Sequence, residues 1–344
     1  MARVAVAMSG GVDSSVTAAL LKQEGHDVIG ITMQVLSPED SPADEASDAR
    51  QIAGILGIPH HVLDLRDVFF QSVIANFCEE YSRGRTPNPC VRCNHYIKFG
   101  ALLEQARGLG ADFIATGHYA RIERDGDRHV LRRGIDTLKD QSYFLCSLTQ
   151  SQLKHVLMPL GDFTKEKVRQ IAQDCELYVT ERGESQEICF VPDDYHGFVI
   201  RQMPQMAKSG PILNRQGKVL GEHRGIINYT IGQRRGIGIA AGEPLYVITI
   251  DAEKNAIVVG SKTEVYQTEL IADEVNWIGM EYPSQPIEVE SKIRYLHRAA
   301  KARLFPLDDC SVHVVFARPQ MAITPGQTVV FYQGDTVLGG GTIK

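Results

Sequence analysis

The sequence predicts an α/β protein that begins with a doubly wound parallel sheet and ends in an all-β region. Up to about residue 203, strand-like and helix-like segments alternate, which is typical of a parallel sheet with helices on both faces. Beyond that residue, short β-rich segments follow one another between Gly, Pro and Asn turns. The chain has 344 residues, more than the roughly 100–200 of one domain, so we expect two or three domains.

The N-terminal part consists of segments whose apolar residues recur with strand and helix periods in turn. A strand, a glycine turn and a helix come first, and further strand–helix units follow. We expect strands at 4–8, 27–35, 60–65 and 112–118, and helices at 12–23, 44–57, 67–81, 97–110, 163–175 and 193–203.

The C-terminal part predicts one small β unit followed by a β-barrel. Its strand candidates are 244–250, 255–260, 287–295, 311–317 and 327–335. We therefore divide the chain into a catalytic domain at 1–203, a central β-rich domain at 204–265 and a C-terminal barrel at 266–344.

Composition favours a cytoplasmic protein. No apolar run approaches the ~20 residues of a membrane helix, so we expect no membrane association. The start, MARVAVAMSGG, leads directly into a strand and a turn and lacks the features of a signal peptide. The seven cysteines are an odd number in a long chain, which favours reduced thiols over a disulfide framework.

The net charge of −6 does not suggest a nucleic-acid binder, but two local runs are basic. Residues 81–100 and 291–303 contain basic residues, no acidic residue, and interleaved Tyr or Phe. Two such runs favour a polyanionic partner, although a solvated face is the alternative for each. The basic residues are Arg83, Arg85, Arg92 and Lys98 in the first run, and Lys292, Arg294, Arg298, Lys301 and Arg303 in the second.

The turn after the first strand, SGGVDSS at 9–15, predicts a phosphate site. Backbone N–H groups at a helix start attract anions, and Asp13 offers a carboxylate for Mg²⁺. The motif lacks the lysine of a P-loop and the spacing of a dinucleotide fingerprint; an ordinary N-cap is the alternative. SGGVDSS resembles the PP-loop of the ATP pyrophosphatases, which have an adenine nucleotide alpha hydrolase-like fold and transfer AMP from ATP to an oxygen.

Three cysteines are candidates for chemistry. Cys90 and Cys93 form a CxxC pair, and Cys189 lies in SQEICFVPD. A structural zinc site usually needs a second pair, which is missing, so zinc is the less favoured reading. The remaining cysteines are expected to be small buried hydrophobes.

Over its whole length the chain resembles the bacterial-type tRNA-specific 2-thiouridylase family. The matching pieces are AMSGGVDSS, ITM at 31–33, GRTPNPCVRCN with IKF, ATGHYAR, LKDQSYFL, SQEICF, NYTIGQRRGIGI and RY at 294–295. The resemblance implies a PP-loop domain, a small central domain and a C-terminal barrel. It also implies ATP-dependent 2-thiolation of the wobble uridine, position 34, in the tRNAs for Lys, Glu and Gln, with release of AMP and pyrophosphate.

The resemblance assigns site residues and partners as well. The partners are the tRNA anticodon stem-loop and a persulfide sulfur donor, such as a cysteine desulfurase or a relay protein. Surface loops are the alternative for each assigned segment. The resemblance implies that Ala7, Met8, Ser9, Gly10, Gly11, Val12, Asp13, Ser14, Met33 and Gly117 bind ATP, that Asn88, Pro89 and Cys90 meet the target base, and that His118, Lys139, Asp140, Gln141, Arg294, Tyr295 and Gln327 contact tRNA.

In the family pattern Cys189 carries a persulfide, Cys93 assists its transfer, and the two end as a disulfide. Both thiols should then be partly thiolate, with a pKa below ~8.5, and we expect Arg85 or Arg92 to supply that shift. Cys90 is a departure, because the best-known family members have an aspartate three residues before the nucleophilic cysteine, so a carboxylate general base is absent at this position. A 4Fe-4S cluster on Cys90, Cys93 and Cys189 is therefore an open alternative to the metal-free persulfide.

Two other classes stay open. A PP-loop synthetase acting on a small molecule would explain SGGVDSS, but not the cysteines, the basic runs or the barrel, and no glutaminase signature is present. A non-catalytic RNA-binding sensor would explain the basic runs and the cysteines, but not a loop suited to pyrophosphate.

If the resemblance holds, Cys93→Ser and Cys189→Ser should each abolish thiolation and leave tRNA binding nearly intact, because each removes one sulfur from the transfer and no phosphate contact. Thiolation of a wobble-uridine tRNA and a filter-binding Kd measure the two effects. Substantial thiolation by either variant would remove that cysteine from the chemistry.

Overall fold

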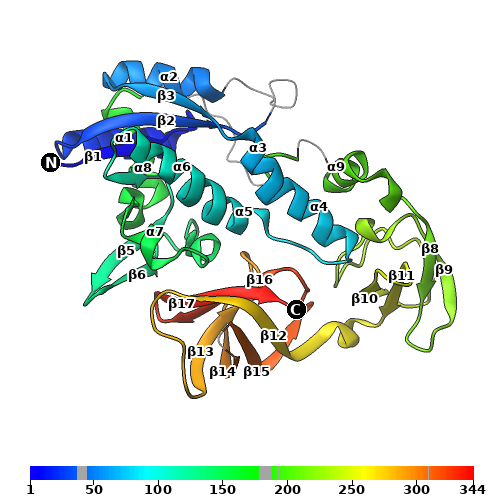
Figure 1. The fold of residues 1–344 in the computed structure, drawn as a ribbon. Coiled ribbons are helices and arrows are strands. Elements are labelled where there is room, and N and C mark those ends of the chain that lie inside the picture. The colour runs from blue at the N-terminus through cyan, green and yellow to red at the C-terminus, as the bar shows by residue number, and fades with distance from the viewer. Residues whose placement is uncertain (37–44, 178–187, 192–193, 309) are drawn as a thin grey trace.

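The computed structural model describes residues 1–36, 45–177, 188–191, 194–308 and 310–344. Figure 1 shows the parallel sheet and its helices at the top left, a barrel below them and a smaller sheet at the right. Among the described residues, no helix is both long and apolar enough to cross a bilayer. The three parts match the predicted fold class.

The first sheet is parallel and has five strands in the order β3–β2–β1–β4–β7. Successive residues of the central strand face opposite sides, so Ala5 packs in one core cluster while Val4 and Val6 pack in another. Both faces are therefore covered, as predicted for a doubly wound sheet. The strands are β1 (Arg3–Ala7), β2 (Asp27–Gln34), β3 (His60–Asp64), β4 (Phe113–Ala115) and β7 (Val156–Leu157). The prediction missed β7, which is too short to show a period.

Helices cover both faces of this sheet (Figure 1). The helix expected at 67–81 is divided by a π-helical segment, Phe70–Ile74, and a second one, Cys93–Ala101, precedes α6. The helices are α1 (Val12–Gln23), α2 (Glu45–Leu56), α3 (Arg66–Phe69), α4 (Ala75–Ser82), α5 (Pro89–Arg92), α6 (Leu102–Gly108), α7 (Gln150–Leu153), α8 (Lys165–Asp174) and α9 (Tyr195–Gln202).

The central sheet has four strands in the order β10–β11–β8–β9. β11 pairs antiparallel with β10 and parallel with β8. The bounds are β8 (Gly210–Leu213), β9 (Val219–His223), β10 (Tyr246–Asp251) and β11 (Ala256–Gly260).

The C-terminal strands form a closed barrel in the order β12–β15–β14–β13–β16–β17, and pairing of β12 with β17 closes it. Gly340 in β17 allows Cys146 to approach, because an added Cβ would lie 2.8 Å from the Cys146 Sγ. The bounds are β12 (Tyr266–Trp277), β13 (Ile287–Lys292), β14 (Ala300–Asp308), β15 (Ser311–Met321), β16 (Thr328–Gln333) and β17 (Thr336–Ile343).

A hairpin from the N-terminal part extends the barrel sheet. It consists of β5 (Ala120–Asp125) and β6 (Arg128–Arg133), and β6 pairs with β17. Arg121 and Arg132 donate to the two carboxylate oxygens of Asp335 at 2.6 and 2.7 Å. The prediction missed this hairpin, whose strands are rich in charged residues.

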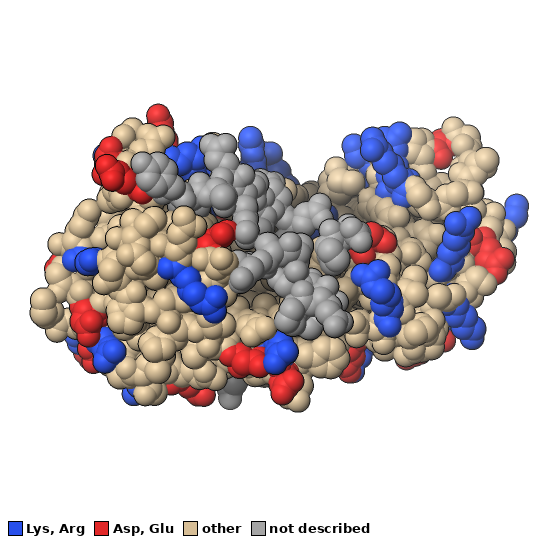
Figure 2. All heavy atoms as spheres, turned by 90° about the horizontal axis from the view of Figure 1, so that it is seen from above, with Lys and Arg blue, Asp and Glu red and all other residues tan. Residues whose placement is uncertain are grey.

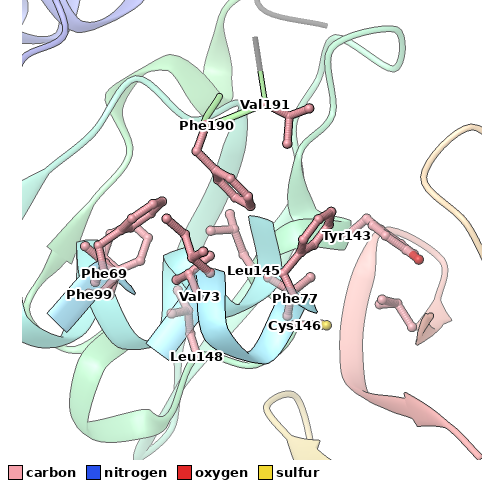
Figure 3. Packing of buried hydrophobic residues seen from close by; sticks show 14 of the residues in the cluster. Phe69, Val73, Phe77, Phe99, Tyr143, Leu145, Cys146, Leu148, Phe190 and Val191 are labelled. Carbon is pink, nitrogen blue, oxygen red and sulfur yellow. The ribbon is translucent and has the colours of Figure 1, made fainter. Parts of the chain in front are cut away.

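An aromatic cluster lies between the helices and the segment after Cys189 (Figure 3). Phe77 is 1% exposed, and its ring centroid lies 4.9 Å from that of Tyr81 and 5.3 Å from that of Phe190. Phe190 also contacts Phe69 and Phe198, at 5.7 and 5.3 Å. Phe190 thus joins the short described segment around Cys189 to the core.

Phe77→Ala should lower the free energy of unfolding by about 3–5 kcal/mol, because it removes a buried ring and leaves a cavity. Equilibrium unfolding in urea measures the loss. Phe70→Ala is the control, since Phe70 is 48% exposed. A Phe77→Ala loss no larger than that of Phe70→Ala would contradict the packing.

Candidate active site

The phosphate loop lies where β1 ends and α1 begins. Gly10 has a φ of +77°, and an added Cβ would lie 2.5 Å from the Cβ of Asp48, so only glycine fits. Gly11 is the N-cap of α1. The first N–H groups of this helix have no intrahelical acceptor, and with the helix dipole they form a site for an anion.

Serine side chains hold this loop in place. The Ser9 N–H donates to the Ser14 hydroxyl at 3.2 Å, and the Ser14 and Ser15 hydroxyls donate to the Gly11 carbonyl at 3.1 and 2.9 Å. Ser14 and Ser15 are buried. The loop is therefore shaped before any ligand binds, which lowers the entropy cost of binding.

The other residues assigned to ATP lie at the same edge of the sheet. Ala7, Met8 and Val12 flank the phosphate loop itself, and Met33 is near the carboxyl end of β2, next to β1. Gly117 follows β4, on the other side of β1. An added Cβ on Gly117 would lie 2.9 Å from the Asp13 Cβ. The structure thus places all ten assigned residues where parallel sheets bind ligands.

A lysine that the sequence reasoning missed reaches this loop from α8. The Lys165 Nζ lies 2.8 and 2.7 Å from the two carboxylate oxygens of Asp13, and the Tyr119 hydroxyl donates to the first of these oxygens at 2.7 Å. The Lys165 side chain is 12% exposed. The loop motif lacks a lysine of its own, and this cation lies 152 residues away in sequence.

The cysteine pair lies on the α5 turn and the π-helical segment after it. Asn88 caps α5 by accepting from the Val91 N–H at 3.4 Å, and Pro89 is its first residue. Cys90 is exposed and Cys93 is partly buried. Surrounding protein desolvates both sulfurs and raises the pKa of each thiol. The expected lowering of the pKa is therefore not seen.

The cation that opposes this rise is Lys98, not Arg85 or Arg92. Lys98 lowers the pKa of both thiols, although burial has the larger effect. The Arg85 Nε pairs with Glu80 at 2.8 Å. The Arg92 Nε donates to the Ser72 carbonyl at 2.9 Å. The two arginines are thus engaged elsewhere.

Lys98 also connects the cysteine loop to His118. The Lys98 Nζ lies 3.5 Å from the His118 Nε2, and the Thr116 Oγ1 lies 2.7 Å from the His118 Nδ1. Burial and the Lys98 charge hold the pKa of His118 well below its usual value. His118 is therefore neutral at pH 7, and its Nε2 accepts from the Lys98 ammonium.

Cys189 is exposed, next to the buried Phe190. Cys90 and Cys93 are close enough for the charge of one to act on the other. Among the described residues, however, no group of three or more His, Cys, Asp or Glu is arranged to hold a metal. The three thiols therefore do not present the ligand set of a 4Fe-4S cluster.

The residues assigned to tRNA are mostly engaged within the protein. Asp140 is buried and accepts from the Gly134 and Ser142 N–H groups. Gln141 accepts from the Tyr119 N–H at 3.0 Å. Lys139 is partly buried, in the loop before Asp140.

The barrel residues of this set are also bonded internally. One Arg294 nitrogen lies 2.6 Å from both the Ala322 carbonyl oxygen and the Thr324 hydroxyl oxygen. Tyr295 packs on Phe144 at 4.4 Å between ring centroids. The Gln327 side-chain nitrogen donates to the Thr86 carbonyl at 2.9 Å.

The basic run at 81–100 is partly neutralised by acids just before it. Arg83 pairs with Glu79 at 2.7 Å and with Glu80 at 3.6 Å. Figure 2 shows Lys and Arg side chains gathered at the right of the molecule, over the part that Figure 1 assigns to the central sheet and α9. The surface seen from above thus carries positive charge beyond the two predicted runs.

Lys98→Met should raise the pKa of Cys93 and move its alkylation profile to higher pH, because the thiolate loses its stabilising cation. We expect an iodoacetamide rate at pH 8 lower by up to about tenfold, which corresponds to ~1 pKa unit. Mass spectrometry of the Cys93 peptide measures the rate, and Lys154→Met, at an exposed site, is the control. An unchanged profile would show that Lys98 does not act on the thiol.

Three family profiles together match nearly the whole chain. The profile described as tRNA methyl transferase HUP domain matches residues 2–193, tRNA methyl transferase PRC-barrel domain matches 196–261, and aminomethyltransferase beta-barrel domain matches 267–343.

Full-length relatives are similar to the chain from end to end. The tRNA-specific 2-thiouridylase MnmA of Clostridium acetobutylicum is 50% identical over 353 aligned positions, which cover 99% of each chain. The protein of the same name from Geotalea uraniireducens is 52% identical over 356 positions, which cover 99% of this chain and 95% of the relative. The chain therefore belongs to the tRNA-specific 2-thiouridylase family.

Proposed function

We propose that this protein uses ATP to convert the wobble uridine of the tRNAs for Lys, Glu and Gln to 2-thiouridine. One observation carries the proposal: the phosphate loop and the cysteine loop are linked by a short series of contacts. Gly117 packs on Asp13, its neighbour His118 contacts Lys98, and Lys98 acts on Cys90 and Cys93. A nucleotide site and a pair of thiols thus adjoin one another.

The first step is adenylation of the base. The uridine O2 attacks the α-phosphorus of ATP, pyrophosphate leaves, and the base becomes an O-adenylyl intermediate. The N–H groups at the start of α1 stabilise the negative charge on the phosphates, and Lys165 adds a positive charge close to the same loop. Asp13 is the carboxylate of this loop, but its oxygens are bonded to Lys165 and Tyr119. Mg²⁺ on the phosphates would therefore have to displace Lys165 to reach it, and bound Mg²⁺ would neutralise phosphate charge.

The second step is sulfur transfer. The terminal sulfur of a Cys189 persulfide attacks C2 of the base, and AMP leaves with the former O2. The Cys93 thiolate attacks the Cys189 Sγ, so the terminal sulfur stays on the base and Cys93 and Cys189 end as a disulfide. A thiol reductant then reopens this disulfide, and a persulfide donor protein reloads Cys189.

We favour the persulfide over an iron–sulfur cluster as the sulfur carrier. The described residues do not assemble a three-thiol ligand set, and the persulfide needs Cys189 to meet only one other thiol, that of Cys93. Cys90 stands three residues before Cys93, where the best-known family members have an aspartate. Because its pKa is raised, the Cys90 thiol is mostly protonated at neutral pH and does not replace the carboxylate as a general base.

Release of AMP and pyrophosphate should depend on a tRNA that has an unmodified wobble uridine, because adenylation needs the base oxygen as its acceptor. Radiolabelled ATP, with AMP resolved by chromatography, measures this dependence, and a tRNA with cytidine at the wobble position is the control. AMP release with a small molecule alone would indicate a synthetase, and a lack of AMP under every condition would indicate a binding protein.

Iron and sulfide analysis after anaerobic purification separates the two sulfur carriers. Activity with a persulfide donor in metal-free protein supports the Cys189 persulfide. About four irons per chain, together with loss of activity on stripping, would contradict it.

A further inference from the structure

The segment at residues 84–88, which leads to Asn88 and the cysteine pair, lies where the three parts of the molecule meet. In Figure 1 it is the chain between α4 and α5, which passes between the helices, the barrel and the central sheet. Asn88 caps α5, so the path of this segment determines where that helix starts. The positions of Cys90 and Cys93 follow from it.

The barrel holds the segment from one side. The Thr86 N–H donates to the Pro325 carbonyl at 2.8 Å. The Gln327 side-chain nitrogen donates to the Thr86 carbonyl at 2.9 Å and to the Pro87 carbonyl at 3.4 Å. Gly326 packs so closely that an added Cβ would lie 3.0 Å from the Thr86 nitrogen.

The central sheet and α4 hold the start of the segment. Gly84 has a φ of +70°, and an added Cβ would lie 2.6 Å from the Ile250 Cγ2 in β10. Arg85, the next residue, pairs with Glu80 of α4. The segment is therefore fixed at both of its ends by different parts of the chain.

We propose that Gln327 is a positioning residue, which sets the place of the cysteine loop through the Thr86 and Pro87 carbonyls already in the free protein. This inference rests on the proposed function. The Gln327 amide nitrogen donates to the Thr86 carbonyl at 2.9 Å and lies 3.4 Å from the Pro87 carbonyl, so it is engaged with this segment without RNA. The barrel thereby takes part in catalysis by holding the thiols, not only by binding substrate.

Gln327→Glu tests the inference, because it keeps the shape of the side chain and replaces the donor with an acceptor that repels the two carbonyls. Gly326→Ala displaces the same segment from the barrel side by steric contact. The matched control is Gln333→Glu, the same change at the exposed last residue of β16, the strand that begins just after Gln327. The melting temperature of each variant confirms that it is folded.

We expect kcat for thiolation at saturating tRNA to fall by about tenfold or more in Gln327→Glu, while the tRNA Kd stays within about threefold of wild type. Gly326→Ala should likewise lower kcat and leave the tRNA Kd nearly unchanged. Gln333→Glu should change neither kcat nor the tRNA Kd. Hydrogen–deuterium exchange in the free protein should be faster for the peptide that contains residues 84–92 in Gln327→Glu.

A tRNA Kd raised by about tenfold with an unchanged kcat and unchanged exchange would overturn the inference and make Gln327 an RNA contact. The exchange measurement needs neither RNA nor ATP. If wild-type protein does not thiolate tRNA, the proposed function fails, and faster exchange around residues 84–92 still decides whether Gln327 holds the segment.

Discussion

The close approach of Gly117 to the first turn of α1 is the constraint on which the rest of the site depends. A Cβ at this position would lie 2.9 Å from the Asp13 Cβ. The chain that follows β4 can therefore approach α1 this closely only with glycine at position 117. Because Gly117 fits, its neighbour His118 is directed to Lys98. The nucleotide loop and the cysteine loop are thereby joined through backbone packing, and neither can shift far without the other.

The barrel contributes to this arrangement at two places. The β5–β6 hairpin continues the barrel sheet, and Asp335 binds an arginine from each of its strands. At the other place, residues 325–327 hold the segment before Asn88. A barrel that only bound RNA would need neither attachment. Two attachments restrict both the translation and the rotation of the barrel relative to the thiols, as a reaction between bound groups requires.

The sequence predicted those parts of the site whose signals are local. SGGVDSS lies between a strand and a helix, and the CxxC pair lies next to its own helix cap, so short stretches reveal both. Lys165 was missed because it meets Asp13 across 152 positions, and no pattern in FTKEK indicates that contact. Arg85 and Arg92 were expected beside the thiols because they are near in sequence. Their actual partners lie on the preceding helical segments, at Glu80 and Ser72.

The raised pKa of Cys90 and Cys93 bears on the proposed sulfur transfer, in which thiols react. A thiol with a raised pKa is mostly protonated at neutral pH, and a protonated thiol reacts slowly with oxidants and other disulfides. Lys98 works against this protection, since it stabilises the thiolate of both cysteines. Its nitrogen is also close to the neutral His118, which accepts a hydrogen bond and adds no charge. The pair is thus kept mostly protonated with a cation beside it, so the same surroundings that slow its oxidation also hold the charge that would stabilise a thiolate.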